Sequence, residues 1–83
     1  MLRPKAIEVK ALNDYKIFVI FNNGEKKVFN LKNKLHHPFY ADLIDEEIFK
    51  SVHTNGYTVE WDGEIDICPD ELYNDSIPYD EAI

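Results

Sequence analysis

The stretch "YKIFVIF", residues 15–21, constrains the fold of this chain more than any other part of the sequence. In an extended segment, neighbouring side chains point to opposite faces, and here both sets are apolar. One face would carry Tyr15, Ile17, Val19 and Phe21, and the other would carry Phe18 and Ile20. Such a run is typical of a central β-strand that is covered on both sides.

The segments on either side extend this prediction to a hairpin. "AIEVKAL", residues 6–12, alternates apolar and charged side chains, which indicates a half-buried strand. "NNGE", residues 22–25, supplies a turn, because Asn and Gly tolerate positive φ angles. We expect a three-residue loop with Gly24 in the left-handed conformation. This loop is expected to set Val19 opposite Phe29 and Ile17 opposite Leu31, which buries more apolar surface than a two-residue loop.

A short helix is predicted between this hairpin and a second one. In "DEEIFKSV", residues 45–52, Asp45 can cap the first turn, and two glutamates follow where the helix dipole favours negative charge. Apolar side chains recur every four residues at Ile44, Ile48 and Val52. We therefore expect a helix of about two turns whose apolar side lies on the sheet.

The stretch "YTVEWDGEIDI", residues 57–67, predicts a second hairpin that turns at Asp62 and Gly63. A loop with an odd number of residues pairs Trp61 with Ile65 and Val59 with Ile67 on one face. Glu60 and Asp66 then project from the opposite face. "CPDELY" follows, and its proline at a first helical position predicts a final helical turn.

Together these segments predict an α+β fold. We expect a small antiparallel β-sheet built from two hairpins, with one short amphipathic helix between them and a final helical turn. The length fits one domain with one modest core. We assign residues 1–73 to a single α+β domain and residues 74–83 to an acidic C-terminal tail, because that segment is polar and broken by proline.

The charge of the chain is acidic and unevenly distributed. Sixteen Asp and Glu residues against nine Lys and Arg give a formal charge of −7, which repels phosphate backbones. We therefore predict no direct binding of nucleic acid. From Tyr40 to the end only Lys50 is basic, so a small basic protein is the partner that this half would suit. The alternative is a solvated acidic face that aids solubility.

Several classes of protein are disfavoured by what the sequence lacks. The single cysteine, Cys68, has no partner for an internal disulfide, and the first residues lack the apolar segment of a signal peptide. The longest continuous apolar run, residues 17–21, is far too short to span a membrane. We expect a cytoplasmic protein that does not enter membranes.

No set of residues has the spacing of a catalytic site or a metal centre. His36 and His37 are adjacent, so they would point opposite ways from an extended segment, although nearby acids such as Asp42 could add a ligand. The acidic stretch after Trp61 lacks the ligand spacing of a calcium-binding loop. We therefore expect no enzymatic activity, no cofactor and no bound metal.

The second hairpin and the turn after it carry the candidate interaction surface. Its residues are Trp61, Asp62, Glu64, Asp66, Asp70 and Tyr73. Trp61 has two interpretations: it is the largest core residue if its face is the inner one, and an anchor for a partner if a strand edge leaves it half exposed. An uncovered sheet edge also offers strand addition and a route to a homo-oligomer.

The order of these segments resembles a known family. The resemblance lies in "YKIFVIFNNGEKKVFNL" at residues 15–31, "FYADLIDEEIFKSV" at residues 39–52 and "VEWDGEIDICPDELY" at residues 59–73. Together they are similar to the short bacterial proteins grouped as domain of unknown function family 2442. The most specific part is the set Trp61, Gly63, Asp66, Pro69, Leu72 and Tyr73. Ile67 stands in place of the usual leucine.

The resemblance implies a small α+β domain with an antiparallel sheet, and it supplies no catalytic residues. Some relatives are fused to helix-turn-helix domains, and many are encoded beside another small protein, which implies a toxin-antitoxin-like or regulatory partnership. We therefore expect a protein-interaction or regulatory module. The alternative is a small-ligand or metal-binding domain that uses the histidines and the carboxylates of the Trp61 hairpin.

Overall fold

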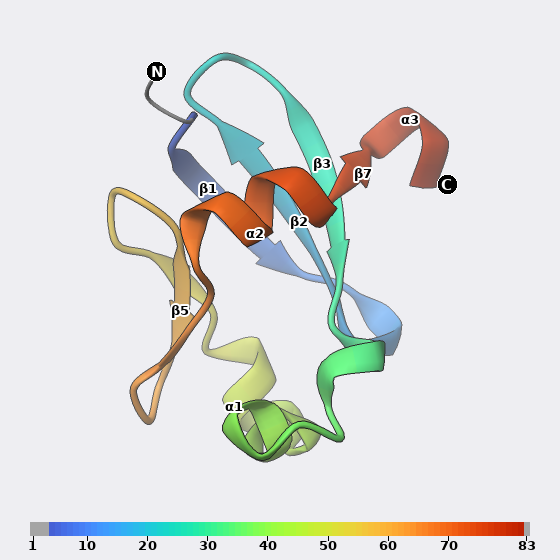
Figure 1. Cartoon of the computed structure of the whole chain (residues 1–83), viewed down its shortest axis with the longest axis vertical. Coiled ribbons are helices and arrows are strands. Elements are labelled where there is room, and N and C mark those ends of the chain that lie inside the picture. The colour runs from blue at the N-terminus through green and yellow to red at the C-terminus, as the bar shows by residue number, and fades with distance from the viewer. Residues whose placement is uncertain (1–3, 83) are drawn as a thin grey trace.

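The computed structural model describes residues 4–82, which form two antiparallel sheets around one core (Figure 1). The first sheet has the strand order β1-β2-β3-β7, with β1 Ala6–Ala11, β2 Lys16–Phe21, β3 Lys26–Asn30 and β7 Ile77–Pro78. The second contains β4 His53–Thr54, β5 Val59–Trp61 and β6 Ile65–Asp66. The α-helices are α1 Glu46–Lys50, α2 Pro69–Asp75 and α3 Tyr79–Ala82, and 3₁₀ turns span Asn13–Tyr15, Lys32–Lys34 and Pro38–Ile44.

The α+β class is confirmed, but the two hairpins lie in different sheets instead of one. Their backbones meet where the Ala6 N–H donates to the Tyr57 carbonyl at 3.2 Å. The strands of the second sheet are only two or three residues long, whereas β1 and β2 of the first sheet have six residues each. The strand β4 packs beside β1 at the edge of the first sheet.

The core lies between the inner faces of the two sheets and the helical segments. On β2, burial alternates, so Ile17, Val19 and Phe21 are buried, whereas Phe18 and Ile20 on the outer face are only partly covered. The outer face of this central strand is therefore covered less than the sequence predicts. Figure 1 shows α2 lying across the first sheet. The remaining core side chains are Ala6, Phe29, Leu31, Leu43, Phe49, Val59, Trp61, Ile65, Ile67 and Leu72.

The first hairpin has the predicted loop but a different register. Gly24 has a φ of 89°, and its N–H donates to the carbonyl of Phe21, whose own N–H donates to Glu25. Because the loop begins directly after Phe21, Ile17 lies opposite Phe29 and Val19 lies opposite Lys27. The predicted pairing placed Ile17 opposite Leu31 and Val19 opposite Phe29, in each case two residues further along the chain, and it is wrong. A shift of two residues leaves each side chain on its predicted face.

The helix between the hairpins begins as predicted but buries a different side chain. The Asp45 carboxylate caps α1 and accepts from the Glu47 N–H at 2.9 Å. Phe49 is 3% exposed, whereas Ile44 is 57% exposed. Of the three side chains in the predicted four-residue period, Ile48 and Val52 pack against the core. Ile44 does not, because it belongs to the preceding 3₁₀ turn, which places Leu43 in the core instead. None of the helices within residues 4–82 is long and apolar enough to cross a membrane.

Part of the segment expected to be an acidic tail lies on the first sheet. Ile77 of β7 pairs with Val28 of β3. The ring of Tyr79 then packs edge to face on Phe18 of the outer face, with centroids 5.1 Å apart. Residues 77–79 therefore extend the sheet and cover part of its outer face.

Trp61 lies inside the core, with 1% of its surface exposed. Its indole Nε1–H donates to the Phe49 carbonyl at 2.9 Å, and the two rings stack with centroids 6.3 Å apart. This bond satisfies the polar atom of the indole, as a buried tryptophan requires. Of the two interpretations of Trp61, the structure supports the core residue, because α1 covers the face of β5 that carries it.

Trp61→Phe should lower the free energy of unfolding by about 2 to 3 kcal/mol, because it removes the indole hydrogen bond and leaves a cavity beside Phe49. Urea denaturation followed by circular dichroism measures this change. Tyr57→Phe is the control, at a side chain that is 63% exposed, and should change the free energy by less than about 0.5 kcal/mol. Equal effects of the two substitutions would contradict the core role of Trp61.

Candidate functional site

The outer face of the second hairpin brings three titratable side chains into one row. His53 lies opposite Glu60 across β4 and β5, and Glu60 lies opposite Asp66 across β5 and β6. Because side chains alternate along a strand, the buried Val59 and Trp61 turn Glu60 outward. We call the four carboxylates of this face and its turn the hairpin rim: Glu60, Asp62, Glu64 and Asp66.

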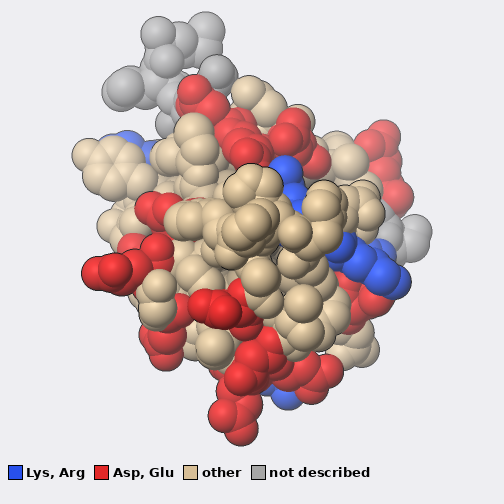
Figure 2. Space-filling view, turned by 60° about the horizontal axis from the view of Figure 1, so that its bottom comes forward, with Lys and Arg blue, Asp and Glu red and all other residues tan. Residues whose placement is uncertain are grey.

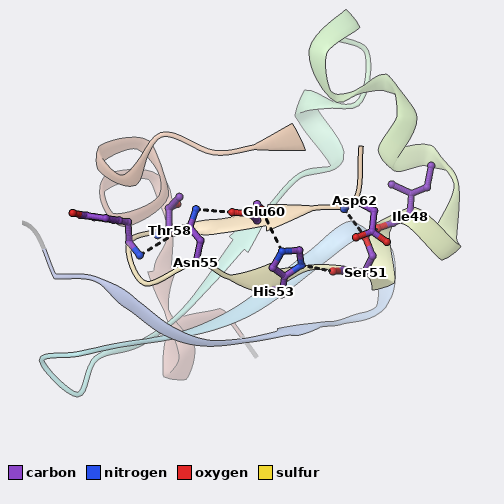
Figure 3. Close-up of polar contacts among 8 residues, drawn as sticks. Ile48, Ser51, His53, Asn55, Thr58, Glu60 and Asp62 are labelled. Carbon is purple, nitrogen blue, oxygen red and sulfur yellow. Dashed lines mark hydrogen bonds and ion pairs between the residues drawn. The ribbon is translucent and has the colours of Figure 1, made fainter. Parts of the chain in front are cut away.

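Figure 3 shows the hydrogen bonds that hold this row. Nε2 of His53 lies 3.3 Å from Oε2 of Glu60, and the Asn55 side-chain N–H donates to Oε1 of Glu60 at 2.7 Å. The side-chain oxygen of Asn55 accepts from the backbone N–H groups of Tyr57 and Thr58, both at 3.0 Å. Both carboxylate oxygens of Glu60 are thus engaged, one by His53 of β4 and the other by Asn55 in the turn between β4 and β5.

Both ring nitrogens of His53 face acceptors. Nδ1 lies 2.9 Å from the carbonyl oxygen of Ser51, and Nε2 faces the carboxylate of Glu60. Only the doubly protonated imidazolium can donate to both groups. The hydrogen bond to Ser51 and then the one to Glu60 therefore raise the pKa of His53 above its ordinary value of 6.5. His53 consequently keeps its positive charge to a higher pH than an ordinary histidine.

Ser51, His53 and Glu60 do not form a nucleophilic relay. The Ser51 hydroxyl donates to the Ile48 carbonyl and accepts from the Asp62 N–H at 3.0 Å, so it joins the end of α1 to the hairpin turn (Figure 3). The imidazole contacts Ser51 through its backbone carbonyl and not through its hydroxyl. Because the Ser51 hydroxyl and the His53 imidazole are both engaged, what the row offers to another molecule is its carboxylates, which can receive a cationic group.

The other predicted surface residues lie on α2. Asp70 is exposed in the first turn, and Tyr73 is partly buried against Phe21, with ring centroids 5.2 Å apart. Lys27 donates to the Tyr73 carbonyl at 3.1 Å, and its ammonium lies 3.9 Å from the centroid of the tyrosine ring. Of the predicted surface, the hairpin carboxylates lie together, whereas Trp61 is buried and Tyr73 packs on the core.

The two neighbouring histidines line a separate hollow of about 400 Å³. Its wall consists of Asn33, Lys34, His36, His37, Phe39, Tyr40 and Glu71. Nζ of Lys34 pairs with Oε2 of Glu71 at 3.1 Å, and burial, followed by the charge of Glu71, raises the pKa of Tyr40. Nδ1 of His37 accepts from the Phe39 N–H, so this ring caps a 3₁₀ turn. Within residues 4–82, no three His, Cys, Asp or Glu side chains are arranged to hold a metal ion.

The strand β4, which carries His53, was not predicted from the sequence. The signal lay in "HTNGYTVE", residues 53–60, where an Asn-Gly pair separates residues that favour strands. Gly56 indeed has a φ of 94° in this turn. A hairpin predicted to start at residue 57 leaves out the strand that carries the His53 imidazole.

Comparison with known proteins supplies a family and a related structure. A model of the family "Protein of unknown function (DUF2442)" matches residues 6–78. No curated protein matches the sequence. The chain is similar to the crystal structure of "Putative DNA Binding Protein NE0471" from Nitrosomonas europaea, with 26% identity and a TM-score of 0.78. The match covers 98% of this chain and 52% of that one, so this chain spans about half the length of its relative.

This likeness corrects the prediction about nucleic acid. The charge of the sequence predicted that the chain has no direct contact with nucleic acid, and its likeness to a protein named for DNA binding contradicts that prediction. The physical error lies in the use of a net charge. The value of −7 sums the whole chain, whereas a phosphate backbone meets one face of a protein.

Acidification should stabilise the fold through His53. Because the folded pKa is raised above 6.5, this contribution is complete below about pH 6.5 and is lost as the pH rises through the folded pKa. The effect should be small, because His53 is exposed. Thermal melts from about pH 5.5 to about pH 8.5 should show a smaller fall in melting temperature for His53→Gln than for the wild type. Parallel curves for the two proteins would contradict this role.

Proposed function

The chain belongs to the DUF2442 family of proteins of unknown function, and from this membership we propose that it is a protein-interaction module with a regulatory role. We propose binding and not catalysis, because the reactive side chains of the hairpin are already engaged. His53 bonds to Ser51 and Glu60, and the Ser51 hydroxyl bonds to Ile48 and Asp62.

The observation that carries the proposal is the position of Glu60 directly opposite Asp66. Like charges that face each other across two strands destabilise a sheet. No Lys or Arg side chain within residues 4–82 forms an ion pair with either carboxylate. His53 pairs with Glu60, but it carries charge only below its pKa. A lysine or arginine of a partner, placed between the two carboxylates, would remove the repulsion.

The surroundings of the hairpin rim favour a protein partner over a free cation. Figure 2 shows Asp and Glu side chains spread over one face of the molecule, with few lysines among them. Tyr57 is 63% exposed and Ile7 is 53% exposed, and the two lie close because Ala6 donates to the Tyr57 carbonyl. Tyrosine is a common anchor of protein interfaces. The expected partner therefore presents cationic side chains to the rim and an apolar contact to Tyr57.

The regulatory part of the proposal draws on the related protein from Nitrosomonas europaea. Its name refers to DNA binding, and this chain matches about half of it. We therefore place the module in an assembly that acts on DNA, in which the rim holds a protein component.

Glu60→Gln combined with Asp66→Asn should weaken binding of the protein partner by about tenfold or more, because it removes the carboxylates that receive the cationic side chains. The partner is recovered by a pull-down from nuclease-treated native lysate, and its affinity is measured by calorimetry at two salt concentrations. Asp42→Asn combined with Glu47→Gln is the matched control, with the same charge change away from the rim. The control should bind within about threefold of the wild type. Equal losses in both variants, or no recovered partner, would overturn the proposal.

A second candidate function is supported by the hollow that contains the histidines. Lys34 and His36 line a space of about 400 Å³, which is large enough for a small anionic ligand. The Lys34 side chain is partly exposed, and its ammonium group already forms an ion pair with Glu71 at the wall of this hollow.

A thermal-shift screen against nucleotides, phosphate and divalent metals tests this candidate. A binding ligand should raise the melting temperature by an amount that grows with the logarithm of its concentration once this exceeds the dissociation constant. His36→Ala should abolish the shift, whereas His53→Ala, outside the hollow, should retain it. A shift that survives His36→Ala would place the ligand elsewhere.

A further inference from the structure

A second face of the molecule has the opposite character to the hairpin rim. On β2, the inward-facing Ile17, Val19 and Phe21 leave Lys16, Phe18 and Ile20 on the outer face. Lys10 of β1 lies opposite Phe18, and Lys26 of β3 lies opposite Ile20. Three lysines thus surround two apolar side chains of the central strand. We call Lys10, Lys16, Phe18, Ile20 and Lys26 the lysine face.

The three lysines of this face have no acidic partner within residues 4–82. Most lysines elsewhere are engaged: Lys32 pairs with Asp14, Lys34 pairs with Glu71, and Lys5 and Lys27 lie over the rings of Tyr57 and Tyr73. Even with Glu8 opposite Ile20 and Asp80 at its border, the lysine face is positive. The chain as a whole carries −7, so charge is segregated between the faces.

The lysine face also contains a hollow with an aromatic wall. The hollow measures about 520 Å³ and is lined by Lys10, Leu12, Phe18, Lys26, Tyr79 and Asp80. The Tyr79 ring stands edge to face on Phe18 at 5.1 Å and remains 37% exposed. Two ammonium groups and a partly exposed aromatic ring therefore border one space on the open side of the sheet.

We propose that the lysine face binds single-stranded nucleic acid, with Lys10, Lys16 and Lys26 contacting phosphates and the Tyr79 ring stacking on a base. Binding of a single strand needs cations along the backbone and aromatic rings for the bases, and this face offers both. A duplex fits less well, because its bases are stacked inside and its major groove admits a helix or a two-stranded ribbon. An acidic peptide would pair with the lysines but would leave the ring unused.

The small number of phosphate contacts predicts weak binding with a defined salt dependence. Each contact on a single strand contributes about −0.7 to the slope of log affinity against log salt concentration. Three lysines therefore give a slope of about −2. The affinity should accordingly fall about twentyfold between about 50 mM and about 200 mM salt.

Fluorescence anisotropy of a short labelled single-stranded DNA of mixed sequence measures this binding with the full chain. Lys10→Gln, Lys16→Gln and Lys26→Gln in one variant should reduce the affinity at low salt by more than about twentyfold and flatten the salt slope. The control is Lys5→Gln, Lys32→Gln and Lys50→Gln in one variant, which makes the same change in net charge away from the face. It should keep a slope near −2 and an affinity within about threefold of the wild type.

Tyr79 is tested by two substitutions that separate stacking from a structural role. Tyr79→Ala should weaken binding by about tenfold and leave the salt slope unchanged, because the phosphate contacts remain. Tyr79→Phe retains the ring and should bind like the wild type. Circular dichroism establishes that each variant is folded. Equal affinities of the alanine and phenylalanine variants would overturn the stacking contact.

Four other results would overturn the proposal as a whole. These are an absence of binding at the lowest salt, equal losses in the two triple variants, tighter binding of the matching duplex, and equally effective competition by a poly-glutamate peptide. The last result would assign the face to an acidic protein segment instead.

This inference does not rest on the interaction proposed for the hairpin rim. Glu60→Gln combined with Asp66→Asn should retain the affinity for single-stranded DNA. The triple variant of the lysine face should, in turn, retain the protein partner. Either proposal can thus be shown to fail while the other still holds.

Discussion

The contact between Trp61 and Phe49 determines which face of the second hairpin is buried and which is exposed. The indole donates to the Phe49 carbonyl and stacks on its ring, which fixes β5 against α1. Because side chains alternate along a strand, an inward Trp61 obliges Glu60 to point outward. The row that contains Glu60 and Asp66 is therefore a consequence of how the core is packed. The buried Trp61 and the exposed acidic row therefore lie on opposite faces of the short strand β5.

The sequence predicted the faces of the strands better than their partners. Alternation placed Ile65 beside Trp61 correctly, because one short loop joins them and leaves a single register that buries both. In the first hairpin the same pattern fits two registers that differ by two residues, so it could not discriminate between Phe29 and Leu31 as the partner of Ile17. The strands β4 and β7 have two residues each, too few to show any period. Their pairing comes from contacts with distant segments, which a local pattern does not contain.

The prediction about nucleic acid failed for a related reason. A net charge adds residues without regard to where the chain places them. The alternation in β2 that buries Val19 also sends Lys16 to the outer face, and the register of the sheet brings Lys10 and Lys26 beside it. Most acidic residues lie instead at the hairpin rim and on the helical segments, and Glu8 and Asp80 are the ones that border the lysine face. An acidic protein can thus present one cationic surface, and the strand pattern determines where that surface lies.

In the proposals above, two faces of opposite charge bind different partners independently. The most direct test is an NMR titration of the isotope-labelled chain with single-stranded DNA, in which the chemical shift of each backbone amide is followed. We expect shifts at Lys10, Lys16, Lys26 and Tyr79, with Glu60 and Asp66 unchanged. Shifts centred on Glu60 and Asp66, or spread evenly over the chain, would contradict it.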